Sequence, residues 1–250
     1  MNFSGKVVLV TGGTSGIGKD TAIAFAKQGA NVVVAGRREA EGHAVVAEIE
    51  KTGQKGLFVK TDVSQEGDVK NLIEKTVEKF GRLDIAFNNA GVESAGPVTE
   101  FQVKDYEHVF GINVLGVLLS QKYEIPVMLK QGGGVIINTT SVLGHVGMPN
   151  VSVYTGSKFA VEGITKVTAL EYAAAGIRVN TVAPAVTQTE MFDRVSGGNA
   201  DNIAAMTAMH PMGRVATPMD IAGAVMFLAS DAASFVTGIS IPVDGGILAR

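Results

Sequence analysis

The stretch Lys6–Gly18 reads KVVLVTGGTSGIG and joins a β-branched apolar run to a glycine-rich turn. The run at residues 6–11 is typical of a strand buried on both faces, and the helical pattern at residues 19–28 follows the turn. Where a strand, a glycine-rich turn and a helix follow one another, the glycines let the backbone approach a pyrophosphate closely. The N-terminus of the helix favours the negative charge of that pyrophosphate. The glycines are spaced more widely than in G-x-G-x-x-G, so a plain glycine-rich helix cap is the alternative.

The same alternation of apolar runs and helical patterns continues along the chain. Further strands are predicted at residues 31–35, 56–60, 83–87, 134–139, 177–183 and 238–243. Helices are predicted at residues 39–52, 65–80, 103–130 and 218–230, the third broken or bent near Pro126. We therefore expect an α/β fold with one domain over residues 1–250. It should be a Rossmann-type doubly wound parallel sheet of about seven strands with helices on both faces.

Composition limits the function. The 250 residues are 46% hydrophobic and 18% charged, which favours a well-buried fold over disorder. With 21 basic and 24 acidic residues and no basic tract, neither nucleic acid nor an anionic membrane is an expected partner. The absence of cysteine removes disulfides and thiolate metal sites, and we expect no metal. No signal-peptide core or membrane-spanning run is found, so a cytoplasmic protein is expected.

The second predicted strand ends in Gly36-Arg37-Arg38. In a dinucleotide-binding unit this position faces the adenosine ribose, where an acidic residue would bind the 2′-hydroxyl. Guanidinium groups match phosphate geometry instead, so the two arginines favour NADP over NAD. The alternative is a solvated helix start, although two basic residues there oppose the helix dipole.

Polar residues follow the next predicted strands. Asp62 could accept a hydrogen bond from an adenine amino group, or could cap the helix at residues 65–80. The segment Asn88–Gly91 suits either a cofactor crevice or a plain turn. Asn113, inside a helical pattern, is a poor helix former that often opens the helix locally; it is either a satisfied core amide or a functional one.

Tyr154 and Lys158 stand four residues apart, which places both side chains on one face of a helix. An ammonium beside a phenol can lower the phenol pKa from about 10 and make it a proton donor. Ordinary surface helices often contain such a pair, so its meaning depends on the rest of the chain. Further on, the long and less regular stretch at residues 187–212 is typical of a substrate lid.

Six segments, taken together, carry a family resemblance: Thr11–Gly18 (TGGTSGIG), Asp62-Val63, Asn88–Gly91 (NNAG), Asn113, Ser141 with Tyr154–Lys158 (YTGSK), and Ile177–Pro184 (IRVNTVAP). In this order they make the chain resemble the compact branch of the short-chain dehydrogenase/reductase family. The resemblance covers the chain nearly end to end, and Ser141 precedes Tyr154 by the thirteen residues expected in the family.

This resemblance implies a catalytic tetrad. Tyr154 would be the general acid in carbonyl reduction and the general base in alcohol oxidation. Lys158 would lower the pKa of Tyr154 and bind the nicotinamide ribose, and Ser141 would hydrogen-bond the substrate oxygen. Asn113 would hold a water that links Lys158 to solvent.

The resemblance also implies binding residues. The cofactor set is Gly12, Thr14, Ser15, Gly16, Ile17, Gly18, Arg37, Arg38, Asp62, Val63, Asn89, Ala90, Gly91, Tyr154, Lys158, Pro184, Val186 and Thr189. The substrate set is Ser141, Leu143, His145, Val151, Tyr154 and Met191, with Val142, Glu93 and Phe192 nearby. His145 is explained slightly better as a loop residue in water. The chain departs from the family at Pro184-Ala185, where Pro-Gly is usual.

The implied activity is hydride transfer between NADP(H) and a ketone or secondary alcohol, as in carbonyl reductases and alcohol dehydrogenases. An NAD-linked dehydrogenase of the same family is the first alternative. A regulator that binds the dinucleotide without chemistry is the second, although such proteins usually lose tetrad residues. The family further implies a homotetramer, and the apolar segment at residues 239–248 is compatible either with an interface or with an ordinary last strand.

Overall fold

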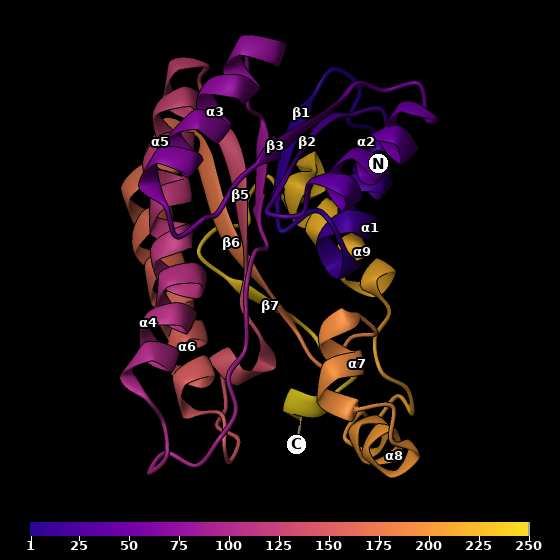
Figure 1. Cartoon of the computed structure of the whole chain (residues 1–250). Helices are drawn as coiled ribbons and strands as arrows, with labels where there is room; N and C mark the ends of the chain where they lie inside the picture. Colours follow the sequence, from indigo (N-terminus) through magenta and orange to yellow (C-terminus); the bar gives the residue numbers. More distant parts are fainter. Residues whose placement is uncertain (250) are drawn as a thin grey trace.

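The computed structural model describes residues 1–249 and contains one parallel sheet between two layers of helices (Figure 1). The strands are β1 (Val7–Thr11), β2 (Asn31–Gly36), β3 (Gly56–Lys60), β4 (Ile85–Asn88), β5 (Gly134–Thr139), β6 (Ile177–Pro184) and β7 (Ser240–Val243). Their order is β3-β2-β1-β4-β5-β6-β7, and every pairing is parallel. The predicted single-domain, doubly wound sheet is therefore confirmed. Because the order reverses between β1 and β4, a crevice opens beyond their carboxyl ends.

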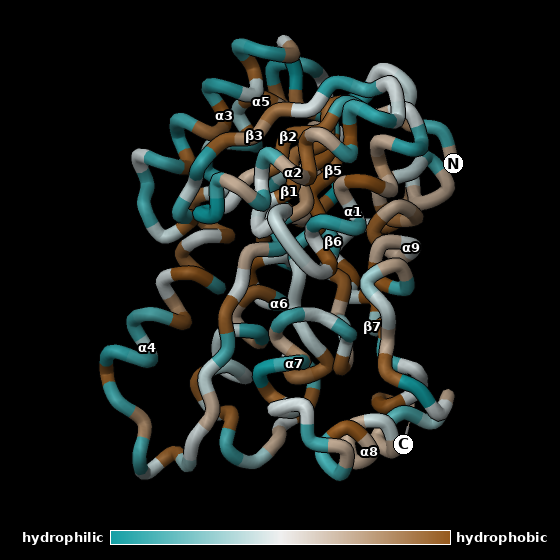
Figure 2. Tube along the Cα trace, turned by 45° about the vertical axis from the view of Figure 1, so that its right-hand side comes forward, coloured by the Kyte–Doolittle hydropathy of each residue, from teal (hydrophilic) through white to brown (hydrophobic). Residues whose placement is uncertain are grey.

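The helices divide between the two faces of the sheet. The first face carries α1 (Gly16–Lys27), α2 (Glu39–Glu50) and α9 (Pro218–Ala229), and the second carries α3 (Glu66–Phe80), α5 (Gly116–Lys130) and α6 (Ser152–Tyr172). Strand β1 shows why the sheet is buried on both sides. Val8 and Val10 belong to the core under the first layer, whereas Val7 and Leu9 belong to the core under the second. Figure 2 shows the hydrophobic strands in the middle and hydrophilic segments on the outer helices.

The long helical region departs from an α-helix around Asn113, where a local opening was predicted, and continues through Pro126. Helix α4 (Val103–Phe110) passes through a π-helical segment, Gly111–Leu115, into α5, and Pro126 lies inside α5 without ending it. The expected break near Pro126 is therefore wrong. The neighbours of the proline, Ile125 and Met128, are buried against the sheet, and this packing holds the helix together across the one missing hydrogen bond.

The stretch at residues 187–212 is more regular than predicted, since it contains α7 (Glu190–Ser196) and α8 (Ala200–Ala208). Each helix has a capping side chain: Thr189 accepts from the Phe192 N–H, and Asn199 accepts from the N–H groups that open α8. Both helices lie beyond the carboxyl end of the sheet, where Figure 1 shows them in orange. Over residues 1–249, none of the helices combines the length and the apolar character that a membrane span requires.

Candidate active site

The glycine-rich turn between β1 and α1 leaves no room for a side chain at Gly12 or Gly18. Gly12 and Gly16 have positive φ angles of 63° and 51°, and a Cβ on Gly12 would lie 2.9 Å from the Ala90 Cα. A Cβ on Gly18 would collide with the carbonyl oxygen of Gly12. Ser15 precedes α1 but caps none of its N–H groups, and the first turn has no acidic residue. The turn therefore offers free N–H groups and positive potential, which fit a pyrophosphate.

The end of β4 is tied to this turn. The Thr11 hydroxyl accepts hydrogen bonds from the N–H groups of Asn89 and Ala90, at 3.0 and 3.2 Å. The Asn89 amide nitrogen in turn donates to the carbonyl oxygens of Thr11 and Gly12, both at 3.2 Å. Asn89, a member of the predicted cofactor set, thus also fixes the shape of the turn. The role of Thr11 as the partner of β4 was not predicted from the sequence.

A cavity of about 410 Å³ lies between the turn and the start of α7. Its lining residues are Gly16, Gln188, Thr189, Glu190, Phe192 and Asp193. The volume falls within the range of small-molecule sites, about 300–1,000 Å³. A Cβ on Gly16 would lie 3.0 Å from the Thr189 methyl group, so Thr189 covers the phosphate turn.

Of the two arginines, Arg38 reaches the turn and Arg37 is exposed. The Nη2 atom of Arg38 donates to Ser15 Oγ at 2.5 Å and, more weakly, to Thr14 Oγ1 at 3.4 Å. Its Nη1 atom donates to both carboxylate oxygens of Glu190, at 3.2 and 2.9 Å. Glu190 was not among the predicted site residues, and it lies 152 positions from Arg38 along the chain.

Asp62 does not cap the next helix. Its Oδ1 atom accepts from the N–H and the hydroxyl of Ser64, whereas α3 is preceded by Gln65, whose side chain makes no cap. Burial raises the pKa of Asp62, but the Ser64 hydrogen bonds and the charge of Arg37 outweigh it and hold the pKa below its usual value. The capping interpretation is wrong because the Asp62 carboxylate accepts its hydrogen bonds from Ser64, in a turn before α3, and not from the N–H groups of the helix.

Asn113 lies in the π-helical segment, which agrees with the expected local opening of the helix. Its side chain exchanges two 2.9 Å hydrogen bonds with the main chain of Val92 and donates to Ser157 Oγ at 3.0 Å. The amide is thus a satisfied bridge between the loop after β4 and helix α6. Val63, a member of the predicted cofactor set, is buried in a small cluster with Ile112.

Tyr154 and Lys158 lie on one face of α6, as predicted. The Nζ atom of Lys158 is 5.5 Å from the centroid of the Tyr154 ring and donates to the Thr139 carbonyl at 3.0 Å. A Cβ on Gly91 would lie 3.6 Å from this Nζ atom and 3.4 Å from Asn113 Oδ1. The fold therefore brings Asn113 of the π-helical segment close to Tyr154 and Lys158 of α6, next to the end of β4.

The ionisation of this pair differs from the expectation. Burial raises the pKa of the Tyr154 phenol to about 12, against the lowering effect of a hydrogen bond with Ser141, and Glu93 adds to the rise. Burial lowers the pKa of Lys158 to about 8, against the charge of Glu162. Desolvation is thus the largest cause of the pKa shift of both groups.

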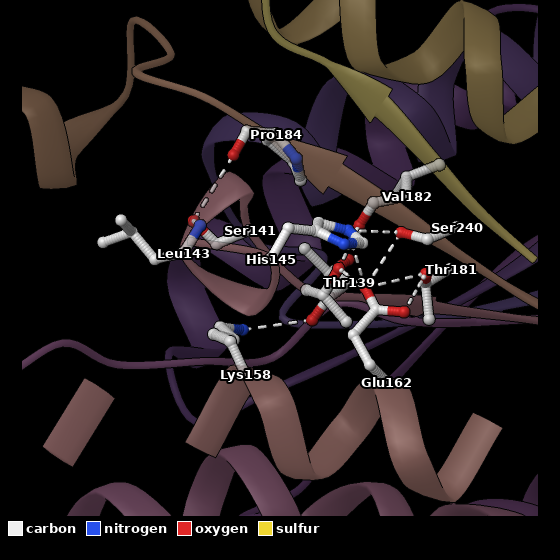
Figure 3. A network of polar contacts seen from close by, with 11 residues as sticks. Thr139, Ser141, Leu143, His145, Lys158, Glu162, Thr181, Val182, Pro184 and Ser240 are labelled. Atoms are coloured by element: carbon white, nitrogen blue, oxygen red, sulfur yellow. Dashed lines mark hydrogen bonds and ion pairs between the residues drawn. The ribbon is translucent and has the colours of Figure 1, made fainter. Parts of the chain in front are cut away.

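Ser141 stands at the carboxyl end of β5, close to the phenol. Its hydroxyl donates to the Pro184 carbonyl at 3.4 Å and accepts from the Leu143 N–H at 3.2 Å (Figure 3). Among the described residues other than glycine, Asn150 alone has a positive φ. Ala185 therefore takes an ordinary backbone conformation, and the departure from Pro-Gly introduces no strain there.

His145 points into a polar network organised by Glu162 (Figure 3). Its Nε2 atom lies 2.9 Å from Ser240 Oγ and 3.3 Å from Glu162 Oε1. The Glu162 carboxylate also accepts from the hydroxyls of Ser240, Thr140 and Thr181, at 2.9, 2.6 and 3.1 Å. His145 is thus more than a loop residue in water. Glu162 follows Lys158 by four residues, and that spacing was the sequence signal that could have identified it.

The predicted substrate wall comes from several segments. Leu143 precedes His145 in the loop after β5, Val151 pairs with Gly96, and Met191 lies in α7. Glu93 is partly buried, and burial raises its carboxyl pKa against the charge of Arg194 at 4.0 Å. Across residues 1–249, no cluster of three or more histidine, aspartate or glutamate side chains could hold a metal ion.

The fold and the site define a Rossmann-type dinucleotide-binding protein with a tyrosine–lysine pair beside the cofactor crevice. The sequence model of a family described as enoyl-(acyl carrier protein) reductase matches residues 12–248. The chain is 43% identical to 2,5-dichloro-2,5-cyclohexadiene-1,4-diol dehydrogenase from Sphingobium indicum, with 99% of each chain covered. It is 40% identical to cyclohexanol dehydrogenase from Acinetobacter sp., with 99% and 97% covered.

Among solved structures, that of levodione reductase superposes with a TM-score of 0.96 at 35% identity over the whole of both chains. The protein belongs to the short-chain dehydrogenase/reductase family, in the compact form expected from its sequence. It is an oxidoreductase that acts on CH–OH groups with a nicotinamide dinucleotide.

Proposed function

We propose that this protein is an NADP(H)-dependent dehydrogenase/reductase of cyclic secondary alcohols and ketones, with Tyr154 as the general acid and base. The observation that carries the proposal is the convergence of Ser141, Tyr154 and Lys158 beside the glycine-rich turn. The ring preference is supported by the relatives, whose names include cyclohexanol and cyclohexadienediol substrates.

A bound nicotinamide would supply or accept the hydride, while the side chains of this protein orient the substrate and transfer the proton. In the reductive direction, Ser141 holds the carbonyl oxygen while Tyr154 Oη donates a proton to it as negative charge develops. The positive charge of the Lys158 ammonium stabilises the resulting tyrosinate. In our proposal the same ammonium contacts the nicotinamide ribose. Asn113 lies in the π-helical segment beside Lys158. There it would hold a water through which a proton returns from solvent to Lys158.

The first experiment measures NADPH oxidation with a panel of cyclic and acyclic ketones. Tyr154→Phe should lower turnover by about 10²–10⁴-fold because the proton donor is gone. Tyr123→Phe is the matched control: that phenol contacts Glu66 on the outer side of α5, and its loss should leave turnover unchanged. Near-native turnover in Tyr154→Phe would show that the assigned acid is wrong. An enoyl thioester in the panel tests the activity that the family description names.

NADP rather than NAD is supported by Arg38, whose guanidinium lies on Ser15 in the phosphate turn. Arg38→Gln should lower kcat/KM for NADPH at least tenfold and leave that for NADH within about twofold. Arg37→Gln, at an exposed side chain, is the control and should have the smaller effect. An NADH preference in the unaltered protein would instead favour the NAD-linked alternative. Tight cofactor binding without turnover of any ketone would favour the regulatory one.

A further inference from the structure

The start of helix α7 is joined to the cofactor turn by one ion pair. Glu190 is the first residue of α7, and its carboxylate receives two hydrogen bonds from Arg38 Nη1. The same guanidinium donates through Nη2 to Ser15 in the turn. Arg38 therefore bridges the proposed substrate lid and the phosphate-binding loop.

The pair is suited to exchange. The side chains of Arg38 and Glu190 are 41% and 53% exposed, and ion pairs at such exposure contribute little to stability. A phosphate monoester carries a charge between about −1.5 and −2 at neutral pH and binds arginine more strongly than a carboxylate does. Arg38 should thus pair with Glu190 when no phosphate is present, and with a phosphate monoester when one is bound.

Glu190 stands where it would oppose such a phosphate. It lines the cavity together with Gly16 and Thr189, directly over the turn. Glu39, the nearest acidic neighbour of Arg38 in sequence, is paired instead with Lys60 at 2.9 Å. A 2′-phosphate held by Arg38 would therefore meet one carboxylate, that of Glu190, at the same guanidinium.

We propose that Glu190 determines cofactor specificity by competing with the 2′-phosphate of NADP(H) for Arg38, and that binding of this phosphate releases the start of α7 from the turn. The inference rests on the proposed use of NADP(H). Because NAD(H) has no 2′-phosphate, its binding leaves the Arg38–Glu190 pair intact.

The test measures dissociation constants for NADPH and NADH by nicotinamide fluorescence, with no substrate present. Glu190→Gln should tighten NADPH binding about twofold to fivefold, since an exposed ion pair is worth about that much, and should leave NADH within twofold. Glu190→Lys should tighten NADPH further. Glu39→Gln removes a carboxylate of the same helix start that does not touch Arg38, and should change neither constant.

Two failures are distinguishable. If Arg38→Gln weakens NADPH binding but both Glu190 variants leave it unchanged, the competition is absent and the inference is overturned, while the proposed cofactor stands. If Arg38→Gln also leaves NADPH binding unchanged, the proposed cofactor preference itself is wrong. Thermal unfolding midpoints within a few degrees of the unaltered protein verify that each variant is folded.

Discussion

Glu162 controls the charge environment of Lys158 from one helical turn away. Burial lowers the pKa of the lysine to about 8, and the negative charge of Glu162 limits this fall. The carboxylate is itself held by hydroxyl donors on β6 and β7, including Ser240. The pKa of Lys158, which is proposed to assist Tyr154, thus depends on a residue outside the proposed catalytic tetrad.

Glu162→Gln should therefore let Lys158 lose its proton at lower pH. We expect the alkaline limb of the kcat/KM profile to move down by about one pH unit, with little change near pH 6. Ser240→Ala is the matched control, since it removes one hydrogen bond from Glu162 but leaves its charge. The pH profiles of both variants between pH 6 and 10 provide the measurement, and an unmoved limb in Glu162→Gln would contradict the assignment.

Individual site residues were predictable where the signal was local. Tyr154 and Lys158 share one helix, so their spacing alone placed them on one face. The partner of Arg38 was not predictable, because Glu190 lies 152 positions away and meets it only after the sheet has formed. The pKa of Tyr154 was misjudged for a related reason, since burial depends on the packed fold.

At the scale of elements, helix α5 carries an unusual buried carboxyl group. Glu124 is fully buried against the sheet and accepts from the Asn88 amide at 3.2 Å, while its other oxygen has no partner within residues 1–249. Burial raises the pKa of Glu124 to about 8, against the weaker lowering effect of Asn88. The folded protein therefore keeps this group neutral at pH values where the unfolded chain ionises it.

The stability of the folded protein should therefore fall at alkaline pH, where Glu124 ionises. The folded pKa lies above the unfolded value, so the stability that Glu124 contributes is full below about pH 4.5 and is lost as pH rises through about 8. Chemical denaturation of the unaltered protein and of Glu124→Gln between pH 5 and 9 should show free energies of unfolding that diverge by a few kcal/mol. Parallel curves would mean that Glu124 ionises normally in the folded state.

Element boundaries were predictable for the strands, because the apolar runs are short and punctuated. The two helices of residues 187–212 were missed, although Thr189 and Asn199 stand at their starts as ordinary capping residues. The glycines between them drew attention to irregularity instead. The local opening of the helix at Asn113 was predictable from the sequence, but the partners of the Asn113 amide, Val92 and Ser157 of α6, were not.

At the scale of the whole molecule, one apolar stripe lies in water when the chain is alone. It runs from the end of the π-helical segment along α5 and α6 and comprises Leu115, Leu118, Phe159, Val167 and Leu170, the last of them 84% exposed. Apolar side chains arranged in this way are typical of an association surface. The stripe supports the homotetramer that the family implies, which remains a proposal.

Light scattering should therefore give a molar mass near four times that of the 25.9 kDa chain. Leu170→Glu places a charge on the stripe without disturbing the core and should lower the mass to that of a smaller assembly. Val195→Glu introduces the same charge at a half-exposed position on α7, outside the stripe, and should leave the mass unchanged. A monomeric unaltered protein would contradict the proposal.

The bond between the end of β4 and the glycine-rich turn has a thermodynamic consequence. Since Thr11 and Asn89 already hold the turn in shape, a dinucleotide meets a preorganised cradle and loses little affinity to the ordering of the loop. The entropy cost of ordering the turn is avoided to the same extent for NADP(H) and for NAD(H). Discrimination between them is left to partly exposed side chains such as Arg38 and Glu190, where single substitutions can change the cofactor preference without altering the shape of the turn.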